Sequence, residues 1–282
     1  MPAPGSLLAS DQIHLRLFVA RRTLIDAARW TLRNMQDSFW RLYLNAQPGA
    51  QLELLNEAGE IETIYDLAAD QLLFVPAGVR FHTYTSAQID HFYIHFDLLG
   101  IPQAALQALF SAPIAIPDVP YLLHEAHTLA ATSTEQEQLS LVRQCRIKAL
   151  VYAALAAYLE DLPSTSAERY QQLLQAQAPI QPALHAIETR LGERLNNRML
   201  AELCHLSEDY FIRVFHVSVG QSPLQYIQAQ RVRRAAQLLL FSMESIEQIA
   251  IATGFGTRAY FSRVFARHLG VGPAAYRRIA HA

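Results

Sequence analysis

The stretch YFIRVFHVSVGQSPLQY at residues 210–226 returns in altered form as YFSRVFARHLGVGPAAY at residues 260–276. Eight positions are identical between the two copies: Tyr, Phe, Arg, Val, Phe, Gly, Pro and Tyr, in that order. The identities are too dense for chance, and they include residue types that pack and end helices. The C-terminal part of the chain therefore contains one structural unit twice.

Each copy has the signals of a short helix, a tight turn and a second helix. Ser207 and Thr257 stand three residues before the paired tyrosines, where each hydroxyl can cap the second helix. Gly220 and Gly270 stand where those helices should end. Three apolar residues per copy have the spacing of one buried helix face: Phe211, Val214 and Phe215, with Phe261, Val264 and Phe265. This pattern predicts two helix-turn-helix units with second helices at 207–217 and 257–267.

A long helix predicted at residues 223–242 joins the two copies. The second helix of a helix-turn-helix unit enters the major groove of DNA. A rigid spacer between two such units would let them enter successive major grooves, which lie about 34 Å apart. A single helical hairpin would be weak evidence, but two matched copies on one spacer are much stronger.

The C-terminal part resembles the AraC/XylS family of bacterial transcription regulators. The resemblance is carried by SEDYFIRVFHVSVGQSPLQYIQAQRVRRAAQLLLFSMESIEQIAIATGFGTRAYFSRVFARHLGVGPAAYRR at residues 207–278. It implies an all-α domain with two helix-turn-helix units that binds double-stranded promoter DNA. The implied base-reading positions are Asp209, Ile212 and Arg213 in the first unit, and Arg258, Ala259, Ser262 and Arg263 in the second. Thr257 and Arg267 complete the expected DNA-binding set.

The two units are expected to read DNA unequally. Arginine can contact guanine, serine can bond to several bases, and alanine can meet a thymine methyl group. Glu208 and Asp209 instead favour the helix dipole and repel phosphate. Asp209 can accept a hydrogen bond from cytosine or act only as a cap, and both interpretations stay open. Arg231 on the linking helix matches a family arginine, for which a structural or phosphate-contacting role is favoured over base reading.

Charge and composition agree with this organisation. From residue 178 onward the chain has 12 arginines, no lysine and 7 acidic residues, a net charge of +5, whereas the preceding part carries −7. A charge of +5 is also ordinary, so it favours a polyanionic partner only mildly. No apolar run reaches the length of a membrane span, the N-terminus is a poor signal peptide, and Cys145 and Cys204 fit no disulfide framework. We expect a cytoplasmic protein with no membrane partner and no cofactor.

The first part of the chain has the pattern of short strands. They are expected within residues 39–97, at FWRLYLNA, QLELLN, EIETIYDL, QLLFVPA, RFHTYTS and HFYIHFDL. DLAADQLLFVPAGVRFHTY at residues 66–84 resembles the family's cupin-type barrel motif, with matches at Asp70, Pro76, Gly78 and His82. Ala69 replaces the usual glycine. The resemblance implies an all-β, cupin-like barrel, which is followed by helices.

A small closed barrel can hold one ligand. The expected effector-binding residues are Arg80, His82, Tyr84, His91 and Tyr93, although each can equally be a surface or ordinary core residue. No metal site is expected, because Tyr84 stands where metal-dependent cupins have the second histidine of a His-x-His pair. In HFYIHFD, alternation places His91 and Tyr93 on one face, expected to meet solvent or a cavity, and the phenylalanines on a core face.

A long helix is predicted at residues 139–162, with Leu141, Cys145, Ala149, Tyr152 and Leu155 near one face. It resembles the family's dimer-forming region, but this stripe can equally pack on the barrel. Residues 175–183 look like a proline-bearing linker. The expected domains are 1–118 for the barrel, 119–176 for the dimerisation and linker helices, and 177–282 for DNA binding.

The combined prediction is a multi-domain, dimeric transcription regulator without enzymatic activity that responds to a small-molecule effector. RNA polymerase is a further candidate partner. Two alternatives stay open: a cupin-type metal-dependent enzyme fused to a DNA-binding domain, and a regulator whose barrel only mediates protein contacts. The pattern does not distinguish an activator from a repressor.

Overall fold

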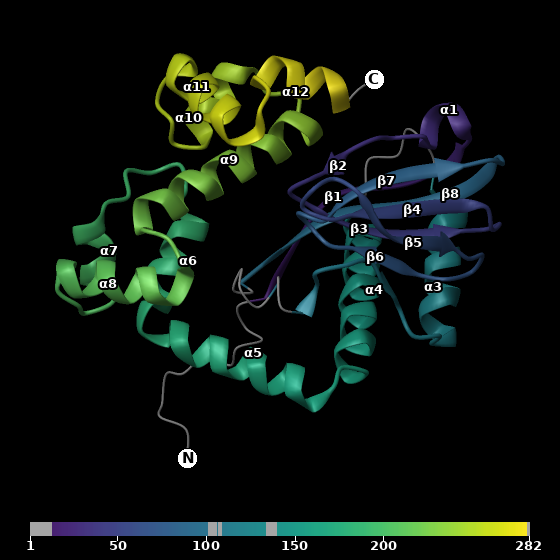
Figure 1. Cartoon of the computed structure of the whole chain (residues 1–282), viewed down its shortest axis with the longest axis horizontal. Coiled ribbons are helices and arrows are strands. Elements are labelled where there is room, and N and C mark those ends of the chain that lie inside the picture. The colour runs from purple at the N-terminus through teal and green to yellow at the C-terminus, as the bar shows by residue number, and fades with distance from the viewer. Residues whose placement is uncertain (1–12, 101–105, 107–108, 134–139, 281–282) are drawn as a thin grey trace. The chain divides into compact units, whose positions relative to one another are not determined.

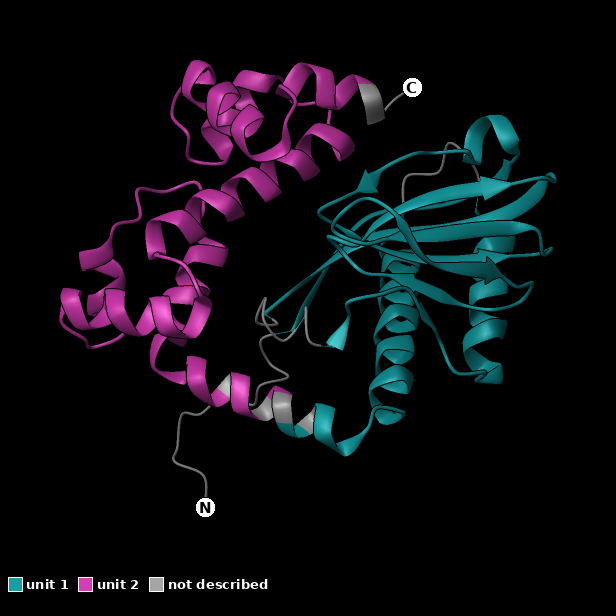
Figure 2. Ribbon diagram, viewed as in Figure 1, with its two compact units in different colours: residues 1–101, 106–168 teal, residues 102–105, 169–282 magenta. Residues whose placement is uncertain are grey.

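The computed structural model describes residues 13–100, 106, 109–133 and 140–280. The described residues form two compact units, which Figure 2 shows in teal and magenta. Unit 1 holds the described residues up to 168, and unit 2 holds those from 169 onward. Unit 1 combines the strands with the first helices, whereas unit 2 is helical. The predicted domain borders after residues 118 and 176 stay predictions.

Unit 1 contains two antiparallel sheets (Figure 1). One has five strands in the order β1-β8-β3-β6-β9, and the other has four in the order β2-β7-β4-β5. The bounds are β1 His14–Ile25, β2 Met35–Gln36, β3 Trp40–Asn45, β4 Ala50–Leu55, β5 Ile61–Leu67, β6 Leu73–Val75, β7 Arg80–Thr85, β8 Ile89–Leu99 and β9 Ile114–Ala115. All six predicted strands are confirmed. The long edge strand β1 and the short helix α1 (Ala27–Trp30) were not predicted.

The closed cupin barrel is not confirmed. Within the described residues, the named strands pair only inside their own sheet, and one isolated bridge joins Asn45 to Ala69. The two sheets instead pack face to face around a core that includes Tyr43, Leu52 and Phe81. Two turns of the cupin-like motif have left-handed backbone, with φ of 55° at Asp70 and 85° at Gly78. The motif therefore forms its local turns without a closed barrel around them.

Strand β8 buries both of its faces. Phe92, Ile94 and Phe96 belong to the core beneath α3 (Pro120–Ala131) and α4 (Leu141–Glu160). His91 and Tyr93 lie on the other face, which meets the second sheet. The predicted alternation is correct, but the face expected to meet solvent or a cavity is covered by the four-stranded sheet.

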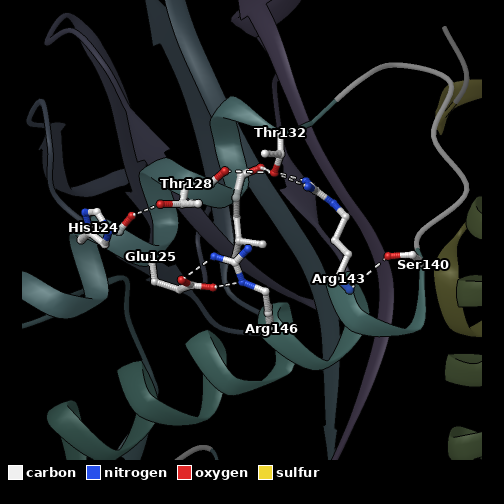
Figure 3. Close-up of polar contacts among 8 residues, drawn as sticks. His124, Glu125, Thr128, Thr132, Ser140, Arg143 and Arg146 are labelled. Carbon is white, nitrogen blue, oxygen red and sulfur yellow. Dashed lines mark hydrogen bonds and ion pairs between the residues drawn. The ribbon is translucent and has the colours of Figure 1, made fainter.

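Two arginines of α4 fix it against α3 (Figure 3). Arg146 donates two hydrogen bonds of 2.7 Å to the carboxylate of Glu125. Arg143 is 8% exposed and donates to Thr132 Oγ1 at 2.7 Å and to the carbonyl of Leu129 at 2.9 Å. Its charge thus lies at the carbonyl end of α3, where the helix dipole favours a cation. The helix predicted at 139–162 is confirmed as α4, while residue 139 lies outside the described residues.

Unit 2 is a run of helices with short connections. Their bounds are α6 Gln181–Thr189, α7 Asn197–Leu203, α8 Glu208–Val219, α9 Pro223–Phe241, α10 Ile246–Ala252, α11 Arg258–Leu269 and α12 Pro273–Ala280. Helix α5 (Ser164–Gln177) precedes them and crosses the border between the units. Among the described residues, no helix has the length and apolar character that a membrane crossing would require.

The prediction of a linker at residues 175–183 is wrong, because this segment is helical. It includes the end of α5, the 3-10 turn η2 (Ala178–Ile180) and the start of α6. Its prolines lie in the first turns of η2 and α6, where a missing backbone N–H costs little. Ile180 is fully buried in the first core of unit 2. The prolines therefore start helices rather than interrupt them.

Candidate nucleic-acid interface

The repeated sequence folds as two helix-turn-helix units, α7–α8 and α10–α11. The turns use an equivalent hydrogen bond, from Leu206 N–H to the Ala201 carbonyl in the first and from Phe255 N–H to the Ala250 carbonyl in the second. Each also has a residue with positive φ, His205 at 55° and Gly254 at 80°. The prediction of two helix-turn-helix units is confirmed.

The ends of the two second helices follow the repeat closely. Thr257 Oγ1 accepts a hydrogen bond from Tyr260 N–H at 3.3 Å, so the predicted cap of α11 is confirmed. Ser207 occupies the N-cap position of α8, but its hydroxyl makes no capping hydrogen bond. Two acidic residues in the first turn of α8 instead interact favourably with the positive end of the helix dipole. Gly220 and Gly270 end the helices with φ of 81° and 75°.

The second recognition helix, α11, separates a packing face from an exposed face. Phe261, Val264 and Phe265 are buried in the second core of unit 2. On the other side, Arg258, Ala259, Arg263 and Arg267 are exposed, and Ser262 is half-buried. Within the described residues, Arg258 and Arg267 have no carboxylate partner. These two charges are therefore available to a polyanion.

The first recognition helix, α8, offers a different set of groups. Asp209 and Arg213 are exposed, whereas Ile212 is half-buried and packs on the first core. The exposed start of α8 is acidic, while α11 starts with Arg258. The first turns of the two recognition helices therefore differ in charge, as the sequence predicts. What each face contacts on DNA stays a prediction.

One arginine in each recognition helix lies over the tyrosine one turn earlier. The guanidinium carbon of Arg213 is 5.2 Å from the centre of the Tyr210 ring, and that of Arg263 is 5.6 Å from the centre of the Tyr260 ring. The hydroxyl of Tyr260 also accepts a hydrogen bond from Gln228 on α9 at 3.2 Å. The three-residue spacing from tyrosine to arginine recurs in both copies of the sequence and is the signal that could have pointed to these pairs.

The residues expected to bind an effector are not brought together. Arg80, His82 and Tyr84 lie on the outer face of β7, because the intervening Phe81 and Thr83 point into the core. His82 Nδ1 accepts a hydrogen bond from Asn34 N–H at 2.8 Å on that surface. His91 and Tyr93, in contrast, lie on β8 between the two sheets. The five residues therefore form two separate groups.

A buried polar group surrounds His91. Its Nδ1 is 2.7 Å from Asn45 Oδ1, and its ring centre is 4.6 Å from that of Trp30. Burial lowers the pKa of His91 to about 3, so the imidazole is neutral near pH 7. Among the described residues, three buried nitrogens in this group have no hydrogen-bond partner: Trp30 Nε1, Asn45 Nδ2 and His91 Nε2. Such atoms are costly unless a water molecule or a ligand bonds to them.

A pocket of about 230 Å³ lies elsewhere in unit 1, lined by Asp70, Asp118 and Leu122 among others. None of the expected effector residues lines it. In the part of the chain that the structure describes, no three His, Cys, Asp or Glu residues are grouped to hold a metal ion. His82 lies on the outer face of β7 and His91 lies between the two sheets, so the two imidazoles are not brought together.

Comparisons with known proteins agree with the helix-turn-helix geometry. A protein-family model described as a helix-turn-helix domain matches residues 200–279. The MmsAB operon regulatory protein of Pseudomonas aeruginosa is 34% identical over 96 residues, which cover 34% of this chain and 31% of that protein. The chain matches less than half of the length of the first curated relatives.

Two solved structures are similar to part of the chain. The DNA-binding domain of AdpA, solved with a target DNA, is 34% identical; the match covers 38% of this chain and 90% of that one, with a TM-score of 0.33. A Chromobacterium violaceum regulator with an AraC-type DNA-binding domain is 28% identical, covering 38% and 96%, with a TM-score of 0.36. The duplicated units and the family-model match show that residues 200–279 form a helix-turn-helix domain, which is similar in sequence to the DNA-binding domains of operon regulators and of an AraC-type regulator.

Proposed function

We propose that this protein binds specific sites in double-stranded DNA and thereby regulates transcription. The observation that carries the proposal is the pair of matched helix-turn-helix units, each with a buried aromatic face and an exposed recognition face. Helices α8 and α11 would enter successive major grooves of a promoter. The name of the Pseudomonas aeruginosa relative, an operon regulatory protein, supports a regulatory role.

In this proposal α11 supplies most of the sequence discrimination. Arg258 and Arg263 can each make paired hydrogen bonds to guanine, and Ala259 can contact a thymine methyl group. Helix α8 contributes Arg213 together with Asp209, whose carboxylate repels phosphate unless it accepts a hydrogen bond from cytosine. The half-site read by α8 should therefore tolerate more base changes than the half-site read by α11.

The binding test is selection of duplexes from a random library by the purified full chain, followed by affinity measurements on the enriched sequence. Specific binding should weaken steeply as salt rises, because bound arginines release counterions from DNA. Arg29 is an exposed arginine of unit 1 that lies outside the proposed interface. Arg29→Ala removes the same charge as Arg258→Ala and therefore serves as its control. Failure to enrich any sequence would contradict the proposed function.

We also propose that unit 1 binds a small neutral ligand between its sheets, beside His91. If Asn45 Oδ1 accepts a hydrogen bond from His91 Nδ1–H, the neutral ring presents an acceptor at Nε2. Trp30 Nε1 and Asn45 Nδ2 add donors, so the group suits a hydroxyl, which can donate and accept. A thermal-shift screen of polyols against organic acids tests this, and stabilisation by no polyol would contradict it.

We propose that the exposed face of α4 binds the same face of a second copy of the chain. Four of the five residues of the predicted stripe are exposed, and Leu155 is buried against the sheet. The exposed apolar positions follow a three-four spacing along the helix: Val142, Cys145, Ala149, Tyr152, Ala156 and Leu159. This is the spacing of apolar residues by which two helices pair. In a two-fold symmetric dimer, the same face of α4 from each copy would contact the other.

A further inference from the structure

Unit 2 has two hydrophobic cores that share no residue. The first contains Ile187, Phe215 and Ile227, and the second contains Val232, Phe261 and Phe265. The border between them falls inside α9, between Ile227 and Val232. Since each core carries one recognition helix, the relative placement of α8 and α11 depends on whatever joins the two cores.

Arg231 lies at this border and connects the two cores. Its Nε donates to the carbonyl of Leu191 at 3.0 Å, and its Nη2 donates to the carbonyl of Glu193 at 2.6 Å. Both carbonyls belong to the loop after α6, whose Leu191 packs on the first core. The arginine is half-buried on α9, so its guanidinium is used inside the protein rather than offered to DNA. This favours the structural role for Arg231 over the phosphate-contacting one.

Two glycines allow the second helix-turn-helix unit to lie close to the loop at residues 191–193. A Cβ atom on Gly254 would lie 2.7 Å from both the Arg231 guanidinium carbon and the Leu191 carbonyl oxygen. A Cβ atom on Gly192 would lie 2.7 Å from the carbonyl oxygen of Ala252, at the end of α10. These separations are too short for any side chain. We call this contact between residues 191–193, Arg231 and Gly254 the Arg231 junction.

Two further contacts stiffen this region. Arg190 donates to the carboxylate of Glu193 at 2.9 and 2.6 Å, which ties the loop to the end of α6. Gln228, one turn before Arg231 on α9, donates to the Tyr260 hydroxyl on α11 at 3.2 Å. The two cores are therefore linked by α9, by the Arg231 junction and by a direct bond from α9 to the second recognition helix.

We propose that the Arg231 junction fixes the distance and rotation between α8 and α11, and so restricts the protein to DNA sites with one spacing between the two half-sites. This inference rests on the proposed DNA binding. One added base pair moves a half-site by about 3.4 Å and rotates it by about 35°. A helix alone can bend and twist over that range more easily than a helix braced at its middle.

The test compares spacing profiles of the full chain. A duplex selected by the wild-type protein is lengthened or shortened by one and two base pairs between its half-sites, and the dissociation constants are measured. The wild-type protein should lose at least about tenfold in affinity for each change of one base pair. Arg231→Ala should lose affinity for the original duplex and show a flatter profile, while Arg231→Lys should fall between the two.

Arg277→Ala is the matched control. Arg277 also donates to two backbone carbonyls, those of Leu239 at 3.2 Å and Glu244 at 2.7 Å, but both lie on the side of the second core. Its removal should lower stability comparably while the preference for one spacing persists. A flat wild-type profile, or an Arg231→Ala profile as steep as that of wild type, would contradict the inference alone. Absence of any selected duplex would contradict the proposed function and the inference together.

Discussion

The guanidinium of Arg263 lies over the ring of Tyr260, with 5.6 Å between the guanidinium carbon and the ring centre. The same contact occurs in the first helix-turn-helix unit, between Arg213 and Tyr210. Both arginines are exposed, so the aromatic ring limits the freedom of a side chain that would otherwise move in solvent. The repeat therefore conserves, in both copies, a means of holding an arginine ready for contact.

Tyr260→Ala should weaken specific DNA binding more than Tyr260→Phe. The phenylalanine keeps the ring beneath Arg263 and loses only the hydroxyl that bonds to Gln228. Loss of the ring should cost about 0.5–1 kcal/mol in binding, the usual range for an exposed cation–π contact. Fluorescence anisotropy with the selected duplex measures both. Equal affinities for the two variants would show that the ring does not position Arg263.

Arg258→Ala should weaken binding by about 1–3 kcal/mol and relax specificity at one base pair, as expected for loss of a base contact. Arg267→Ala, in the last turn of α11, should weaken binding equally on all sequences if it contacts phosphate. Affinities on a panel of single-base variants of the selected duplex separate the two patterns. A uniform loss for Arg258→Ala would contradict its role in reading bases.

Gly254→Ala should lower the free energy of unfolding by more than about 2 kcal/mol, because it combines a strained backbone with steric overlap. The added methyl group would meet Arg231 and the Leu191 carbonyl, at a backbone φ of 80°. His205 has the equivalent positive φ in the first turn and is exposed. His205→Gly should therefore leave stability unchanged or raise it by up to about 1 kcal/mol. Denaturation followed by far-ultraviolet circular dichroism measures both, and equal effects would refute the comparison.

The stability of unit 1 should fall as the pH is lowered from neutral. Burial lowers the pKa of His91 from 6.5 to about 3, so the unfolded chain binds a proton at pH values where the folded chain does not. His95 is shifted in the same direction by burial. The contribution from His91 should decrease by up to about 2 kcal/mol between about pH 7 and pH 5.

Tryptophan fluorescence reports this change in unit 1, because both tryptophans, Trp30 and Trp40, lie there. Denaturant titrations of wild type and His91→Gln should differ in the slope of stability against pH, with the smaller slope in the variant. His82→Gln is the control, because His82 lies on the outer face of β7. Identical slopes for wild type and His91→Gln would contradict a buried, neutral His91.

Ala149→Glu should convert a dimer into a monomer. Ala149 lies in the middle of the exposed stripe of α4, where two negative charges would face each other across a two-fold axis. Lys148→Glu, beside it on the helix and outside the stripe, changes the charge by −2 rather than −1, so a dimer retained in this control excludes a general effect of added negative charge. Sedimentation velocity measures the oligomeric state. A wild-type monomer at micromolar concentration, or a dimeric Ala149→Glu variant, would contradict this interface.

The C-terminal half was readable from the sequence because its determinants are local. Glycine stops and the spacing of Phe211 and Phe215 each act within a few residues and occur twice, and the N-cap positions also recur, although only Thr257 makes its capping hydrogen bond. The Arg231 junction was not readable, since Arg231 and Leu191 are distant in sequence and meet only after both cores have formed. The linker prediction failed because prolines were read as breaks, although they begin helices here.

In unit 1 the strands could be predicted from the sequence, but their arrangement into two packed sheets could not. Alternation shows which residues share a face of β8, yet it does not show that a second sheet covers the face with His91. For the same reason, five polar residues close in sequence were assigned to one pocket. The pleat of β7 instead sends Arg80, His82 and Tyr84 outward, away from His91.

We propose that α8 and α11 make this chain a sequence-specific binder of double-stranded DNA. It is tested most directly by the affinity of the full chain for a selected duplex and for a scrambled duplex of equal length, at about 0.15 M salt. We expect the selected duplex to bind at least about a thousandfold more tightly. Equal affinity for the two duplexes would contradict it.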